Sequence, residues 1–111
     1  MLNSKSLKIY SKNLMERYPG NVPVIIKKSS NEKILQDIDK TKYLMPKNLT
    51  ISEIVFIIRR KINLKPEEAI FIFVNGNILV PMNTTINEIY NTYKSDDDFL
   101  YMTYRSENVF G

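Results

Sequence analysis

The sequence contains neither cysteine nor histidine. Without cysteine the chain can form no disulfide, no thiolate nucleophile and no cysteine-ligated metal site. Without histidine it lacks the commonest general base and the commonest metal ligand. We therefore expect no catalytic residues, no metal and no other cofactor, and the composition fits an intracellular setting.

Long apolar runs are also missing. No stretch approaches the roughly 18–20 residues that span a bilayer, and residues 1–13 are too charged for a signal peptide. Asp96, Asp97 and Asp98 do not resemble a calcium loop, because consecutive carboxylates point in different directions and no glycine or distal glutamate completes the pattern. We expect a solvated turn there.

Positive charge is concentrated in one part of the chain. Residues 1–61 carry 13 Lys and Arg against 5 Asp and Glu, whereas residues 62–111 carry 3 against 7. This asymmetry indicates a basic face that attracts acidic partners or anionic lipid, or a solvated surface that is basic in one half only. RNA-binding motifs are absent, so we expect no nucleic-acid partner.

With 111 residues, 43% of them apolar, the chain has the size of one domain with a modest core. Periodicity and turn residues predict helix, strand, strand, helix, hairpin, helix and strand, in that order. These elements are expected over residues 4–17, 22–28, 42–46, 49–62, 69–80, 84–93 and 99–105. The polar segment 29–41 is expected to form a loop.

The helix expected over residues 49–62 has the strongest local signal. Thr50 and Glu53 are spaced as a capping box. Ile54 lies at the edge of the predicted core stripe and Ile57 lies further round on the same side. The stripe itself consists of Ile51, Val55, Ile58 and Ile62. The apolar face of this helix is therefore wider than a single contact with the core requires.

The strand over residues 22–28 is apolar on both faces and needs cover on both. We expect the main helix to cover one face and the N-terminal helix, through Leu7, Tyr10 and Leu14, to cover the other. Pro23 has no N–H to donate. We therefore expect it near the start of the strand, or on a side of the strand that lies at a sheet edge.

The order of elements predicts an α+β fold, the ubiquitin-like β-grasp with an added N-terminal helix packed on the sheet. We expect an N-terminal helical extension over residues 1–21, a ubiquitin-like domain over residues 22–106 and a flexible C-terminal tail over residues 107–111.

Several separated blocks resemble one protein family, in the order of that family. The blocks are KYLMPKNLT (42–50), the helix end IIRRKI (57–62), AIFIFVN (69–75) and DFLYMTYRSENVFG (98–111). Through them, residues 14–111 resemble the autophagy ubiquitin-like modifiers of the GABARAP and light-chain-3 type.

The resemblance implies that activating and conjugating enzymes join the C-terminal glycine, here Gly111, to phosphatidylethanolamine. It implies a cytoplasmic protein that, when lipidated, marks autophagosomal membranes and recruits receptors with aromatic-x-x-aliphatic motifs. It further implies a cysteine protease that removes the residues most members carry beyond this glycine and that also deconjugates the protein. Because this sequence ends at Gly111, we expect a form that is encoded ready for use or already trimmed.

Glycine suits an acyl donor because no Cβ obstructs a narrow catalytic channel, which Asn108, Val109 and Phe110 would also contact. Three alternatives remain: an ordinary chain end, an interaction module that is never conjugated, and a modifier joined to protein lysines.

The resemblance also implies a receptor groove with two pockets. The aromatic pocket corresponds to Leu14, Pro23, Ile25, Lys42, Leu44 and Phe99. The aliphatic pocket corresponds to Tyr43, Met45, Pro46, Leu49, Ile54 and Ile57. The off-stripe positions of Ile54 and Ile57 agree with this assignment; the alternative is that they belong to the core of a thick domain.

The strand over residues 42–46 has the features of an exposed sheet edge. It is short and ends at Pro46. Lys40, Lys42 and Lys47 lie in or beside it, and lysine at a sheet edge disfavours unwanted pairing with other strands. A receptor peptide could add to such an edge as a further strand. Tyr10 stands where many relatives have an acidic residue, and it either narrows the aromatic pocket or only packs on it.

The chain departs from the family pattern at several points. We expect the first short helix of the family to be missing; Asn21 stands where the family has an arginine, and Lys27 where it has an acidic residue. Single residues are inserted before Asp39 and near NGNILVP. We expect these changes to affect partner selectivity more than the fold.

Overall fold

The computed structural model describes residues 3–106, so the predicted tail at 107–111 lies outside the described residues. The predicted elements are all present, in the predicted order. They are α1 (Ser4–Arg17), β1 (Asn21–Lys28), β2 (Lys42–Pro46), α2 (Ile51–Lys61), β3 (Phe71–Val74), β4 (Ile78–Leu79), α3 (Ile86–Tyr93) and β5 (Leu100–Arg105).

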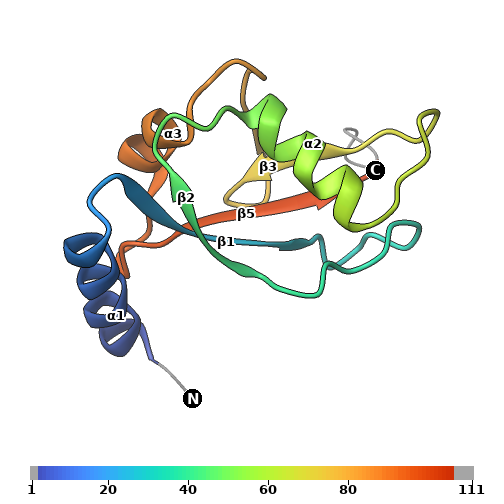
Figure 1. Ribbon diagram of the computed structural model, residues 1–111. Coiled ribbons are helices and arrows are strands. Elements are labelled where there is room, and N and C mark those ends of the chain that lie inside the picture. Colours follow the sequence, from blue (N-terminus) through green and yellow to red (C-terminus); the bar gives the residue numbers. More distant parts are fainter. Residues whose placement is uncertain (1–2, 107–111) are drawn as a thin grey trace.

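The strands form one mixed sheet in the order β2-β1-β5-β3-β4 (Figure 1). β1 and β5 are parallel, and the other neighbours are antiparallel. β1 is an interior strand, so the edge position considered for Pro23 is wrong. Pro23 instead lies near the start of β1, one residue before the pairing of Val24 with Leu100 begins. The fold is the predicted α+β, ubiquitin-like arrangement.

The hairpin turn and the helix caps form as their sequences predict. Asn75 and Gly76 both have positive φ, 51° and 85°, as a type I′ turn requires. The Thr50 N–H donates to Glu53 Oε1 at 3.0 Å, and the Glu53 N–H donates to Thr50 Oγ1 at 3.3 Å. The N-terminal ends of α2 and α3 are joined as well, because the Ile51 N–H donates to the Thr84 carbonyl at 3.0 Å.

α2 lies across one face of the sheet and supplies much of the core (Figure 1). The prediction placed Ile54 at the edge of the buried stripe, which is wrong, because Ile54 is only 1% exposed. Val55, predicted within the stripe, packs against the core but remains partly exposed. The helix has a wide apolar face, and the sheet meets it on the side of Ile54 rather than that of Val55.

The segment over residues 29–41 has no helix or strand, as expected, but it is held firmly. Leu35 and Ile38 are buried. The Tyr104 hydroxyl donates to the Gln36 carbonyl at 2.6 Å and accepts from the Ile38 N–H at 3.0 Å. A side chain of β5 thus fixes a loop that has little regular structure of its own.

α1 lies at the end of the sheet where β1 begins (Figure 1). Ser11, its one buried residue, places its hydroxyl 2.7 Å from the Asp97 carbonyl. Leu7 and Leu14 are only partly buried, and the Tyr10 ring stacks on Phe99 with 6.2 Å between the centroids. The expected apolar stripe is therefore a peripheral contact, and a polar anchor accompanies it.

The acidic turn is not fully solvated, contrary to expectation. Asp97 is buried and accepts hydrogen bonds from the Phe99 N–H and the Tyr101 hydroxyl. Burial, together with the hydrogen bond to Asp97 and its charge, raises the pKa of Tyr101 to about 12. Asp97 therefore organises the turn on which α1 rests.

Candidate functional site

β2 forms one edge of the sheet. It pairs with β1 in the register Val22–Met45, Pro23–Leu44 and Val24–Tyr43, and within residues 3–106 no strand pairs with its other side. An edge of this kind presents unpaired N–H and C=O groups, to which another extended chain can bind.

A cavity of about 190 Å³ lies between β2 and α2. All six residues predicted for the aliphatic pocket line it: Tyr43, Met45, Pro46, Leu49, Ile54 and Ile57. For comparison, an engineered apolar cavity of about 150 Å³ binds benzene in another protein. The cavity is therefore large enough for an aliphatic side chain.

The alternative, that Ile54 and Ile57 belong to the core, holds in part for Ile54 and does not hold for Ile57. Ile54 is a core residue whose side chain also reaches the cavity wall. Ile57 is 44% exposed although it is a large apolar side chain.

Four residues outside the predicted aliphatic set also line this cavity: Ile26, Leu44, Ile58 and Lys61. Helical spacing could have identified two of them, because Ile58 and Lys61 lie four residues beyond Ile54 and Ile57. Leu44 belongs to the set predicted for the aromatic pocket, and it also lines this cavity.

Two ammonium groups flank the rim of the cavity. Lys40 Nζ and Lys61 Nζ lie 5.9 and 5.7 Å from the centroid of the Tyr43 ring, within the range of cation–π contact. The Tyr43 hydroxyl donates to the Lys40 carbonyl at 2.7 Å. Burial, with a contribution from the Asp39 charge, raises the pKa of Tyr43. The rim thus favours a partner with acidic residues.

Four of the six residues predicted for the aromatic pocket lie on the paired strands β1 and β2, and the Tyr10 ring stacks on a fifth, Phe99. β1–β2 pairing aligns Pro23 with Leu44 and Ile25 with Lys42. The Tyr10 ring lies on Phe99, and Lys42 Nζ is 5.5 Å from the centroid of that ring. A neighbouring cavity, formed by residues of α1, shares only Leu14 with the predicted set.

The predicted conjugation site, Gly111, follows β5 in the chain, and Ser106 is the last described residue before it. The Ser106 N–H donates to Glu32 Oε1 at 2.7 Å, and the Ser106 hydroxyl donates to the same oxygen at 3.0 Å. The carboxylate also accepts the N–H groups of Ile34 and Leu35, both at 2.9 Å. Burial alone would raise the pKa of Glu32, but these donors outweigh it and hold the pKa below its ordinary value. Gly111 lies outside the described residues.

Between residues 3 and 106, no cluster of three acidic, cysteine or histidine side chains could hold a metal ion. In the same range no helix is both long enough and apolar enough to cross a bilayer.

Comparison with known proteins places the chain in a family. A family model described as the ubiquitin-like autophagy protein Atg8 matches residues 7–111. Autophagy-related protein 8 of Schizosaccharomyces pombe is 46% identical over 104 residues, which cover 94% of this chain and 84% of that protein. Autophagy-related protein 8d of Arabidopsis thaliana is 45% identical over 98 residues, covering 88% of this chain and 80% of that protein. The chain therefore belongs to the Atg8 family of ubiquitin-like autophagy modifiers.

Proposed function

We propose that this protein is conjugated through Gly111 to phosphatidylethanolamine and that its β2 edge recruits receptors with aromatic-x-x-aliphatic motifs. In this function it passes between the cytoplasm and autophagosomal membranes. It is a substrate of activating, conjugating and deconjugating enzymes and supplies no catalytic group beyond its own carboxylate.

The conjugation chemistry needs only a terminal carboxylate. The Gly111 carboxylate attacks the α-phosphorus of ATP and pyrophosphate leaves, which gives an acyl adenylate. An enzyme thiolate then displaces AMP, and the lipid amine displaces the thiolate to form an amide. Glycine suits these steps because no Cβ obstructs the approach to its carbonyl carbon.

The observation that carries the receptor part is the cavity beside an edge strand, lined by all six residues of the predicted aliphatic pocket. In an extended peptide, residues separated by an odd number of positions point to opposite faces. A peptide paired with β2 would therefore direct its aliphatic residue toward α2 and its aromatic residue, three positions away, toward Phe99 and α1. Lys40 and Lys61 favour acidic residues beside this motif.

Reconstitution with activating and conjugating enzymes and vesicles that contain phosphatidylethanolamine tests the conjugation. We expect the intact mass to increase by one lipid on Gly111, and the Gly111→Ala variant to conjugate slowly or not at all. Gly20→Ala is the matched control, because an added Cβ at Gly20 would meet nothing within 4 Å.

Normal conjugation of Gly111→Ala would contradict the role of the glycine. The mass of the protein from cell membranes distinguishes the alternatives. An isopeptide remnant would indicate a modifier of protein lysines, and an unmodified chain would indicate an interaction module alone.

A further inference from the structure

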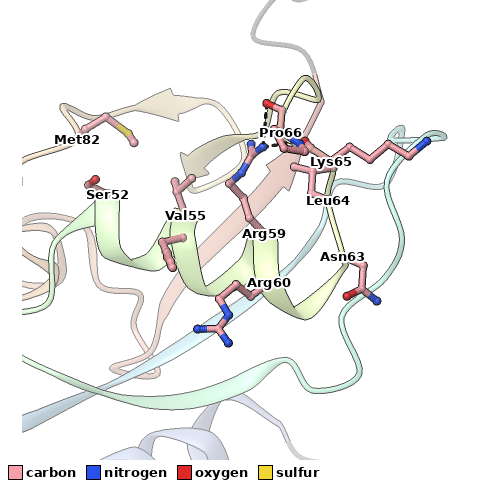
Figure 2. Close-up of a pocket in the computed structure, with 10 residues that line it drawn as sticks. Ser52, Val55, Arg59, Arg60, Asn63, Leu64, Lys65, Pro66 and Met82 are labelled. Carbon is pink, nitrogen blue, oxygen red and sulfur yellow. Dashed lines mark hydrogen bonds between the residues drawn. The ribbon is translucent and has the colours of Figure 1, made fainter.

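A second groove lies on the flank of α2 away from the β2 cavity. Five residues of α2 line it, together with the segment 63–66 and Met82 (Figure 2). Its volume is about 990 Å³, and it includes none of the twelve residues predicted for the two receptor pockets. We call it the α2–Met82 groove; its lining residues are Ser52, Val55, Phe56, Arg59, Arg60, Asn63, Leu64, Lys65, Pro66 and Met82.

The walls of this groove are fixed by hydrogen bonds. The Arg59 guanidinium donates to the carbonyls of Glu68 at 2.8 Å and Lys65 at 2.9 Å, and Figure 2 shows its side chain reaching toward Lys65 and Pro66. On the other side, the Ser52 N–H donates to the Met82 carbonyl at 2.9 Å. A partner would therefore meet a groove that is already formed, which lowers the entropy lost on binding.

The floor and rim have the composition of an interaction surface. Phe56 and Met82 are 51% and 50% exposed, and the Arg60 guanidinium carbon lies 5.7 Å from the centroid of the Phe56 ring. Single exposed apolar residues are ordinary on protein surfaces. Here they line one concave site together with arginine, and aromatic residues, methionine and arginine are the types enriched in protein–protein interfaces.

The charge of the lining has one sign. Arg59, Arg60 and Lys65 are its charged residues, and none of the residues that line the groove is acidic. Because Arg59 is engaged with backbone carbonyls, Arg60 and Lys65 are the cations best placed to meet a partner. Aromatic residues, methionine and arginine together favour a protein segment over a lipid surface as the partner.

We propose that the α2–Met82 groove docks a protein segment in which an apolar side chain stands beside acidic residues. The apolar side chain packs between Phe56 and Met82, and the carboxylates face Arg60 and Lys65. The groove and the β2 edge lie on different flanks of α2, so the protein binds two partners at once. This proposal does not depend on lipid conjugation or on the receptor motif.

Neighbouring residues on α2 provide matched variants for the test. Phe56 and Arg60 line the α2–Met82 groove, whereas Ile57 and Lys61 line the β2 cavity. Phe56 and Ile57 are both apolar and about half exposed, and Arg60 and Lys61 are both exposed cations. The probe is a display library of random short peptides, selected on the full chain and measured by titration calorimetry.

We expect enriched peptides with an apolar residue next to Asp or Glu, whose affinity falls about tenfold or more in Phe56→Ala and in Arg60→Glu. The same peptides should bind Ile57→Ala and Lys61→Glu normally. Thermal unfolding of the four variants checks that each is folded.

Three results would overturn the proposal. In the first, no selected peptide depends on Phe56 or Arg60. In the second, the dependent peptides carry no acidic residue. In the third, the wild type binds vesicles of anionic phosphatidylserine, Phe56→Ala and Arg60→Glu do not, and no peptide binds the groove. That result would assign the surface to lipid.

Discussion

The β2 edge and the end of β5 are stabilised by different kinds of interaction. The cavity at β2 is formed by apolar side chains, and most of them also contribute to the core or pack against it. Just beyond β5, Ser106 donates its N–H to the carboxylate of Glu32, which also accepts hydrogen bonds from Ile34 and Leu35. Packing is non-directional and insensitive to pH, whereas this hydrogen-bonded contact depends on the ionisation of one side chain.

This difference separates two activities that the proposed function combines. Partner capture should respond to the volume and exposure of apolar residues along β2 and α2. Presentation of the C-terminal segment should respond to the charge of Glu32. A substitution that affects both must act through the shared core.

Ile54→Ala should have the largest effect, because Ile54 belongs to both the core and the cavity wall. We expect the free energy of unfolding to fall by about 2–5 kcal/mol, as for other large-to-small core substitutions. Urea unfolding measures it, and capture and conjugation should decline together. An unchanged urea midpoint with lost peptide binding would show that Ile54 serves the pocket alone.

Ile57→Ala should separate the two activities. Because Ile57 is exposed, we expect the free energy of unfolding to change by no more than about 0.5 kcal/mol. The affinity for an aromatic-x-x-aliphatic peptide should fall by about 1–3 kcal/mol, measured by titration calorimetry, while the conjugation rate stays the same.

Phe56→Ala is the control, because Phe56 is next to Ile57 in the chain but lines the α2–Met82 groove instead of the β2 cavity. If the peptide binds Ile57→Ala as tightly as the wild type, the assignment of the aliphatic pocket is wrong.

The sequence predicts the β2 cavity better than it predicts the surroundings of that cavity. Helical periodicity and the resemblance identify Ile57 as a cavity residue. Periodicity alone cannot decide which flank of a wide apolar helix meets the sheet, so it predicts Ile54 at the edge of the buried stripe rather than within it. Glu32 and Ser106 are 74 positions apart, and no local pattern links a glutamate in a polar loop to the end of a distant strand. The burial of Asp97 was missed for the same reason, because its environment is created by the packing of α1 and by Tyr101.

Tyr10→Ala tests why the two halves of the β2 edge differ. The aliphatic half is an open cavity, whereas in the aromatic half the Tyr10 ring stacks on Phe99. An incoming aromatic side chain must displace Tyr10, and stacked aromatic pairs are worth about 0.5–1.5 kcal/mol. We therefore expect the variant to bind the peptide more tightly by about that amount in calorimetry.

Tyr18→Ala is the matched control, because Tyr18 is similarly exposed and lies just beyond α1. Weaker binding by Tyr10→Ala would show instead that the Tyr10 ring forms part of the pocket wall.

Acidification should produce the smallest effect, and protonation of Glu32 should reach only the groups bonded to its carboxylate, which are Ser106 after β5 and Ile34 and Leu35 in the segment 29–41. Since the pKa of Glu32 is lowered in the folded state, its hydrogen bonds stabilise this region fully above the ordinary value of 4.5 and are lost as pH falls through the folded-state pKa. The amide proton of Ser106 should therefore titrate in NMR spectra with a midpoint below 4.5, and Glu32→Gln should abolish the transition. The methyl signals of Ile57 should not follow it, because apolar packing has no proton to lose. A Ser106 midpoint at or above 4.5 would mean that burial outweighs the donors, and the end of β5 would then be held less tightly than its hydrogen bonds imply.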